Sequence, residues 1–343
     1  MPDISISDKL YEPTKLAAIV DTIVSEGVPL AEALRNVGVP ADTLHNPATQ
    51  ISIKQLLTAC RNAARLSRNQ HFPYAVGENV HVSAYGMYGY AILCSTNFRR
   101  AMDFATNYHP LATPLAAISY SEEPGRAIWT LEPVEHAEID EQLYRFIVEL
   151  QIGIHTSLHR DIMGQTFAPR EITLAYQPGS DFHLTEDLAG CPLRFGQSAN
   201  RIIFDSKWLD EPPRFGNRIT YATTLAACDD LLADLSFRSG AAGKVRDILL
   251  RNLAGRKTLS DAAQLLGTTS RTLSRQLRDQ GTSFRTLSDQ LRSQAAMKFL
   301  RETTMTNEHI ASALGFVDEA NFRHAFQRWT GKTSSEYRRA RRP

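Results

Sequence analysis

The spacing of apolar residues predicts a mixed helix and strand region followed by a helical one. Apolar positions recur every three or four residues over Thr14 to Val37, Ile53 to Leu66 and Phe98 to Tyr108, which predicts helices. Another long helical pattern runs from about Ile139 to Met163. Short strand-like runs follow the first three helices, at 115–120, 126–131, 171–176, 192–195 and 201–204.

The remainder of the chain carries helical patterns. A helix is predicted over Arg218 to Leu235, and the small residues of SFRSGAAG, 236–243, are flexible enough for a linker. We therefore expect an α+β N-terminal domain, a mixed sheet with helices, over residues 1–235. An all-α C-terminal domain should occupy residues 244–343.

The C-terminal region contains two copies of one pattern. LSDAAQLLGTTSRTLSRQLRDQG (259–281) and NEHIASALGFVDEANFRHAFQRWTG (307–331) each place Ala four positions before Gly, and a polar helix cap follows. A small residue lets two helices cross closely, and the glycine permits the turn between them, as a helix-turn-helix requires. The apolar positions of 283–302 predict a linker helix, so we expect two helix-turn-helix motifs joined by it.

The second helix of each copy has an apolar face and a basic, amide-rich face. At about 100° per residue, Phe322, Phe326 and Trp329 share a face, as do Leu273 and Leu277 in the first copy. The opposite faces carry Arg271, Ser274, Arg275 and Arg278, and then Asn321, Arg323, His324, Gln327 and Arg328. Because Arg pairs with guanine and Asn or Gln with adenine, these side chains are candidate readers of the major groove of DNA.

The charge is divided between the two regions. Residues 244–343 hold 19 Lys and Arg against 9 Asp and Glu, a net charge of +10. The preceding 243 residues hold 19 against 28, a net charge of −9, so the whole chain is close to neutral at +1. This division indicates that the C-terminal region meets a polyanion and that the N-terminal region does not.

The stretch GFVDEANFRHAFQRWTGKTSSEYRR, 315–339, resembles the signature of the AraC/XylS family of bacterial transcription regulators. The resemblance covers Lys244 to Arg341 and implies an all-helical DNA-binding domain with two helix-turn-helix motifs. It implies DNA contacts at Arg271, Ser274, Arg275, Glu319, Asn321 and His324. Many members have Arg where His324 stands, so we expect the second motif to bind its bases more weakly or in a pH-sensitive way.

Two N-terminal stretches also resemble a known type of sensor. GYAILCSTNFRRAMDFATNYHPL (89–111) and CPLRFGQSANRIIFDSKWLDEPP (191–213) resemble the mixed helix and strand sensor of regulators of ornithine use and of mycobacterial virulence. The resemblance implies that residues 1–235 bind a small organic metabolite as effector and dimerise. The implied partners are double-stranded promoter DNA, a second copy of the chain and RNA polymerase.

The candidate ligand-binding residues have aromatic side chains that carry a polar group. YGMYGY (85–90) lines a pocket or permits close packing of helices, and packing is the favoured interpretation. Tyr88, Trp129, Tyr144 and His155 are chosen because each offers a polar tip in an apolar setting. His155 and His159 have a spacing that can bind a metal, but HTSLH lacks the Glu of the HExxH motif. We expect no metal, no cofactor and no catalytic residues.

Composition narrows the class of protein further. No apolar run approaches the roughly 18 residues that span a membrane, and the four cysteines are scattered singly, which favours reduced thiols in the cytoplasm. We expect a ligand-responsive, sequence-specific transcription regulator, an activator by the habit of the family. The alternatives are an enzyme tethered to DNA, for which no convergent catalytic set is found, and a ligand-independent DNA-binding protein.

Overall fold

The computed structural model describes residues 5–179, 183–251, 253–255 and 257–339. Its internal contacts divide it into two compact units, Ser5–Ala233 and the part that begins at Asp234. The two units have separate hydrophobic cores. None of the helices within the described ranges is long and apolar enough to cross a membrane.

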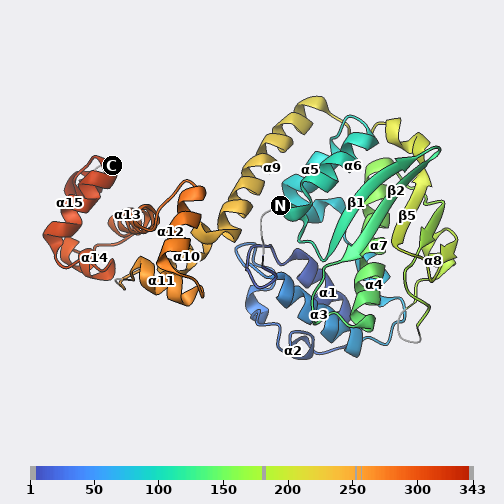
Figure 1. The fold of residues 1–343 in the computed structure, drawn as a ribbon, viewed down its shortest axis with the longest axis horizontal. Coiled ribbons are helices and arrows are strands. Elements are labelled where there is room, and N and C mark those ends of the chain that lie inside the picture. The colour runs from blue at the N-terminus through green and yellow to red at the C-terminus, as the bar shows by residue number, and fades with distance from the viewer. Residues whose placement is uncertain (1–4, 180–182, 252, 256, 340–343) are drawn as a thin grey trace. The chain divides into compact units, whose positions relative to one another are not determined.

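A five-stranded mixed sheet lies in the N-terminal unit (Figure 1). Its strands are β1 (Ala116–Glu123), β2 (Arg126–Pro133), β3 (Glu171–Thr173), β4 (Leu193–Arg194) and β5 (Asn200–Asp205). In space they follow the order β1-β2-β5-β3-β4, and each neighbouring pair is antiparallel except β3 with β4. Every strand overlaps the run that predicts it; β1, β2 and β5 extend beyond their runs, whereas β3 and β4 are shorter. The predicted mixed sheet is confirmed.

Helix α7 (Glu141–Met163) packs against β1 and β2 on one side and against α4 (Phe72–Glu78) on another (Figure 1). It is buried on all sides over 147–157, so it needs neighbours all round. Two glycines bring α4 and α7 together. A Cβ at Gly77 would lie 2.2 Å from the carbonyl oxygen of Leu150, and one at Gly153 would lie 2.3 Å from that of Tyr74.

Several shorter helices surround α7 and the sheet. They are α1 (Thr14–Ser25), α2 (Leu30–Ala33), α3 (Ile53–Leu66), α5 (Gly86–Leu93), α6 (Phe98–Asn107) and α8 (Glu186–Ala189), with 3-10 turns η1 (Ala41–Thr43), η2 (Val82–Tyr85), η3 (His109–Ala112) and η4 (Ser206–Asp210). The prediction of one helix from Thr14 to Val37 was wrong. Gly27, at φ 91°, and Pro29 interrupt it, because that φ is left-handed and proline cannot continue a helix.

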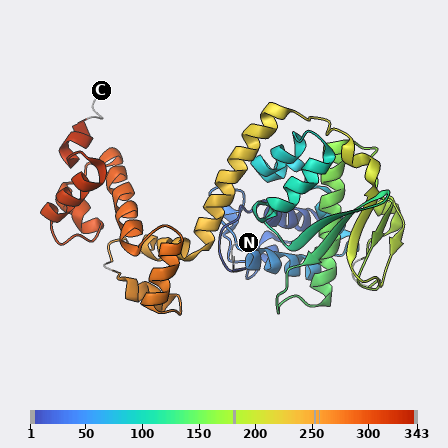
Figure 2. The ribbon, with the colours of Figure 1, turned by 45° about the horizontal axis from the view of Figure 1, so that its top comes forward.

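From Asp234 onward, every regular element in the described residues is a helix (Figure 2). Helix α9 (Arg218–Ser239) crosses the boundary between the units and includes the first half of the predicted linker. It is followed by α10 (Ala241–Leu250), α11 (Leu259–Leu265), α12 (Ser270–Asp279), α13 (Phe284–Glu302), α14 (Asn307–Ala313), α15 (Glu319–Thr330) and α16 (Ser334–Arg339). Gly240 precedes α10, so the predicted linker is helical apart from this residue.

The C-terminal unit has two small hydrophobic cores. Helix α13 runs between the two groups of helices that form them (Figure 2). Leu287 and Leu291, in the first half of α13, pack with the residues of α10, α11 and α12. Ala296 and Leu300, in its second half, pack with those of α14 and α15. The predicted pair of helix-turn-helix motifs joined by a linker helix is therefore confirmed.

Candidate nucleic-acid interface and ligand cavity

The two helix-turn-helix motifs repeat the same local geometry. The first helices, α11 and α14, are capped by the Thr258 and Thr306 hydroxyls, each of which accepts a backbone N–H three residues on. The turns contain Gly267 and Gly315, both at positive φ. Gly315 also meets the chain closely, because a Cβ there would lie 2.4 Å from the carbonyl oxygen of Ala254. The glycine of the second copy is thus required by both its conformation and its packing.

Helix α12 buries one face and exposes the other. Its cap, the Thr269 hydroxyl, accepts the N–H of Thr272 at 3.2 Å. Leu273 and Leu277 are fully buried in the first core. Arg271, Ser274, Arg275 and Arg278 are exposed, as are Gln276 and Asp279. No hydrogen bond or ion pair joins the side chains of the first four to another described residue, so the three guanidinium groups are available to a ligand.

Helix α15 has the same arrangement with more internal contacts. Its cap, Asp318, accepts the backbone N–H of Asn321 at 2.7 Å and also the side-chain amide of Asn321 at 3.0 Å. The exposed side chains are those of Asn321, Arg323, His324, Gln327 and Arg328, and Glu319 is half-buried. Arg323 lies 3.5 Å from Glu319, and Arg328 lies 3.4 Å from Asp289 of α13. These ion pairs are exposed and weak, so DNA phosphates can compete for both guanidinium groups.

The N-terminal unit contains a cavity between α7 and the strands β1 and β2. Residues of α1, η2, α5, α6 and η3 complete its lining. Its free volume is about 40 Å³, where one water molecule needs about 10–15 Å³. Most of its wall is apolar or aromatic, and its polar members are Lys15, His109, Gln151, His155 and His159. No Asp or Glu stands among the described residues that line it.

Lys15 is a buried cation in the first turn of α1. Its ammonium donates to the carbonyl oxygens of Ala112 at 2.7 Å and Thr113 at 3.0 Å, and it lies 5.3 Å from the centre of the Tyr85 ring. Burial lowers its pKa from 10.5 to about 7. Thr113 has a left-handed φ of 51°, which a β-branched residue rarely adopts. The buried Lys15 thus holds a strained segment through two of its three donors.

The histidines of α7 that face the cavity are neutral. Burial lowers the pKa of His155 to about 3, and it holds the pKa of His159 well below its usual value. The indole N–H of Trp129 donates to Nε2 of His159 at 3.1 Å. Since an indole only donates, Nε2 must be the unprotonated nitrogen. Nδ1 of His159 therefore carries the proton, and it is buried without a hydrogen-bond partner among the described residues.

The cavity includes three of the four residues proposed from the sequence as ligand contacts. Tyr88, Trp129 and His155 line it, whereas Tyr144 does not. The Tyr144 hydroxyl instead accepts from the side-chain amide of Asn200 at 2.7 Å. In YGMYGY, Tyr85 and Tyr88 line the cavity, and Gly89 packs closely against the backbone of η2. Whether the segment contacts a ligand stays a prediction.

Sequence reasoning missed Lys15, His109, Gln151 and His159 as lining residues. A Lys followed directly by the apolar run of residues 16–20 was the available signal for the first of them. Within the described residues, no three His, Cys, Asp or Glu side chains are grouped to hold a metal ion.

Two family models match the chain. Residues 27–213 match the N-terminal arabinose-binding domain of the AraC transcription regulator. Residues 262–340 match a helix-turn-helix domain, which covers both motifs except for the first residues of α11. The first match alone covers more than half of the 343 residues.

Relatives with both regions are found among curated proteins. The ornithine utilization regulator of Pseudomonas aeruginosa is 28% identical over 323 residues, which is 94% of each chain. An uncharacterized HTH-type transcriptional regulator of Mycobacterium tuberculosis is 28% identical over 337 residues, covering 96% of this chain and 97% of the other. Among solved structures, the transcriptional regulator CdpR from Pseudomonas aeruginosa is 19% identical with a TM-score of 0.49, covering 94% of this chain and 96% of the other.

Proposed function

This chain belongs to the AraC family of transcription regulators, and we propose that a small organic metabolite bound in its N-terminal unit controls how its C-terminal unit acts on a promoter. It is a DNA-binding regulator with a ligand-binding domain, and its relatives are regulators rather than enzymes. The boundaries that we propose are residues 1–235 for sensing and dimerisation, 236–243 for the linker and 244–343 for DNA binding.

The observation that supports sequence-specific reading is the exposed basic face of α12. Arg271, Ser274 and Arg275 are exposed and unpaired among the described residues, on a helix whose opposite face is buried. We assign base contacts to these three residues and to Glu319, Asn321 and His324 of the second motif. Arg278, Arg323, Gln327 and Arg328 flank them and are assigned to phosphates and neighbouring bases.

Residues 240–343 alone should bind DNA, because the charge and both motifs lie within them. The operator is first selected from a random duplex library with the full chain. The affinity of residues 240–343 and of residues 1–235 is then measured on the selected duplex and on a scrambled duplex of equal composition. Retention of operator affinity by residues 1–235 contradicts the proposal, and equal affinity of the full chain for both duplexes favours the ligand-independent alternative.

A second protomer and RNA polymerase are further proposed partners. We propose that two protomers bind paired sites and that α9 joins them. The support is that Ile219 and Leu231 are exposed, at 81% and 45%, although Leu225 and Cys228 pack on the core of their own unit. We further propose that the regulator acts in the cytoplasm as an activator that recruits RNA polymerase. In vitro transcription from the selected operator, with and without the protein, tests the direction of regulation.

A further inference from the structure

The charge and the hydrogen-bond donors in the lining of the N-terminal cavity favour one class of ligand. Lys15 is its cation, and none of the described residues in its lining is an acid. Lys15 lies in the first turn of α1, where the helix dipole disfavours a cation and favours an anion. Because the described lining contains no acid, no carboxylate there offsets the cost of burying this ammonium.

Two of the three donors of Lys15 are used by the carbonyl oxygens of Ala112 and Thr113. The third remains for a ligand. Nδ1–H of His159 is a second donor in the lining, buried and without a partner among the described residues. A ligand that satisfies both donors must supply hydrogen-bond acceptors, and one that also offsets the buried charge must be an anion.

The rest of the cavity is hydrophobic. Trp129, Tyr85 and Tyr88 supply aromatic surface, and Ile92, Met102 and Ile118 supply aliphatic surface. This wall favours a ligand with an apolar body. The free volume of about 40 Å³ has room for a few water molecules, at about 10–15 Å³ each, which favours a compact ligand. A ligand with an ammonium group would place a second cation beside Lys15, and no acid in the described lining would compensate it.

We propose that the effector is a compact organic monocarboxylate whose carboxylate is bound by Lys15 and whose apolar body lies against Trp129. This inference rests on the proposed function, because it names the ligand class of the same sensing unit. A carboxylate beside Lys15 favours the ammonium form. At about pH 8, where the buried amine is largely uncharged, binding should therefore take up close to one proton.

Proton uptake on binding can be assigned to Lys15 only if its titratable neighbours do not change protonation near that pH. The groups that face it are Cys60 of α3, His109 of η3, His155 of α7 and Tyr85 of η2. Burial raises the pKa of Cys60 to about 12 and raises that of Tyr85 further still. Burial lowers the pKa of His109 and of His155 to about 3. Lys15 is the group of this set that titrates near neutrality.

The test uses the full chain and matched probes of one size but different charge. Benzoate, benzamide and benzylamine form one trio, and isovalerate with its amide and amine forms a second. Calorimetry at about pH 8 in buffers of different ionisation enthalpy gives both affinity and proton uptake. We expect the carboxylates to bind at least about tenfold more tightly than the amides and amines, the effect of a charge-assisted hydrogen bond.

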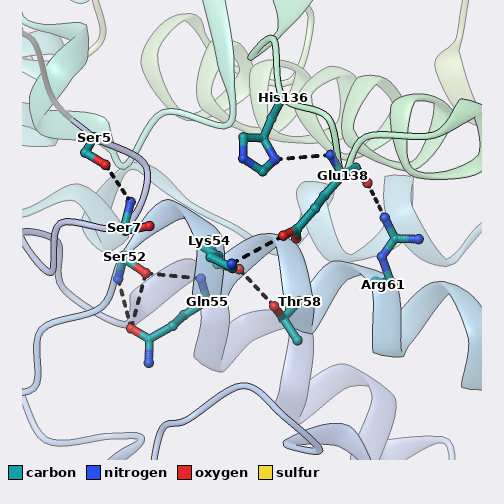
Figure 3. Close-up of polar contacts among 9 residues, drawn as sticks. All are labelled: Ser5, Ser7, Ser52, Lys54, Gln55, Thr58, Arg61, His136 and Glu138. Atoms are coloured by element: carbon teal, nitrogen blue, oxygen red, sulfur yellow. Dashed lines mark hydrogen bonds and ion pairs between the residues drawn. The ribbon is translucent and has the colours of Figure 1, made fainter.

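The variant Lys15→Met should abolish this preference and the proton uptake. The control is Lys54→Met. Lys54 lies on α3, is half-exposed and faces Glu138 at 3.3 Å (Figure 3), and it is not among the residues that line the cavity. If Lys15→Met does not fold, the proposal is tested on the wild-type protein alone, by its preference among the probes and by the proton uptake on binding. Figure 3 also shows the capping of α3 by Ser52 and Gln55, which Lys54→Met leaves intact.

Three results would overturn the proposal. They are the failure of every carboxylate to bind, equal or tighter binding of the amides or amines, and an unchanged carboxylate affinity in folded Lys15→Met. Binding to the selected operator is measured on the same preparation. Loss of carboxylate selectivity with intact DNA binding rejects this ligand class alone, whereas absence of DNA binding rejects the proposed function.

Discussion

At the scale of single residues, the two sites differ in whether their basic side chains are exposed or buried. Arg271 and Arg275 are exposed, charged and unpaired among the described residues, which leaves them free to bind an anionic duplex. Lys15 and His155 are buried, and burial lowers the pKa of each. Mutations at the first site should therefore change recognition, and mutations at the second should change stability and ligand binding.

Arg271→Ala or Arg275→Ala should weaken binding to the selected operator by about 1–3 kcal/mol and relax the base preference at one position. An Arg that contacts phosphate would instead weaken binding to all duplexes alike and reduce the salt dependence. Titration of specific and scrambled duplexes at two salt concentrations separates the cases. Arg35→Ala, in the N-terminal unit, is the control, and unchanged binding in both α12 variants would contradict the assigned register of that helix.

The buried His155 should make the N-terminal unit sensitive to acid. Its pKa is about 3 in the folded chain and about 6.5 when unfolded. Between these values the unfolded state binds more protons, so the stabilisation is complete above about pH 6.5 and is lost as pH falls toward 3. His155→Gln should reduce the slope of unfolding free energy against pH by about 1.4 kcal/mol per unit.

Urea unfolding of the wild type and of His155→Gln at several pH values measures that slope, with the exposed His45→Gln as control. Comparing the variants isolates His155 from Glu149. Burial raises the pKa of Glu149 from 4.5 to about 7, so its effect on stability runs in the opposite direction between those values. Equal slopes for the wild type and His155→Gln would show that this histidine is not buried in its neutral form.

At the scale of elements, the glycine crossing of α4 and α7 should be the most sensitive point of the N-terminal unit. Gly153→Ala forces its Cβ against the backbone of Tyr74 and should destabilise the fold by about 1–3 kcal/mol. In Gly179→Ala, the matched control, the new Cβ meets the end of the Arg145 side chain rather than a backbone atom. Thermal or urea unfolding distinguishes them, and equal stabilities would refute the close crossing.

Elements with a regular pattern could be predicted from sequence, and features that depend on tertiary packing could not. The helices from α11 to α15 follow from apolar spacing, caps and glycines that are all local. The break after Ser25 was missed because its apolar pattern continues across Gly27 and Pro29. The burial of Lys15 was missed because lysines are seldom buried, and here the accepting carbonyls come from Ala112 and Thr113, which are distant in sequence.

At the scale of the whole molecule, the proposed dimer makes a prediction for residues 1–235. This fragment should sediment as a dimer at tens of micromolar if α9 joins two protomers. Ile219→Asp with Leu231→Asp should convert it to a monomer, because both side chains are exposed apolar groups of that helix. Leu30→Asp, at another exposed apolar position, is the control. A wild-type fragment that sediments as a monomer, with and without ligand, would leave pairing to DNA alone.

Helix α13 sets both the distance between the two helix-turn-helix motifs and the rotation of one relative to the other about the helix axis. Its 19 residues correspond to about 28 Å, and each residue adds about 1.5 Å of length but about 100° of rotation. One residue inserted between Leu291 and Ala296 would barely change the separation of the two motifs, yet it would turn one of them more than a quarter of a revolution away from the other. The number of residues in α13 therefore sets how the two motifs are turned relative to one another, and an insertion should disturb DNA binding more than an exchange of one exposed side chain.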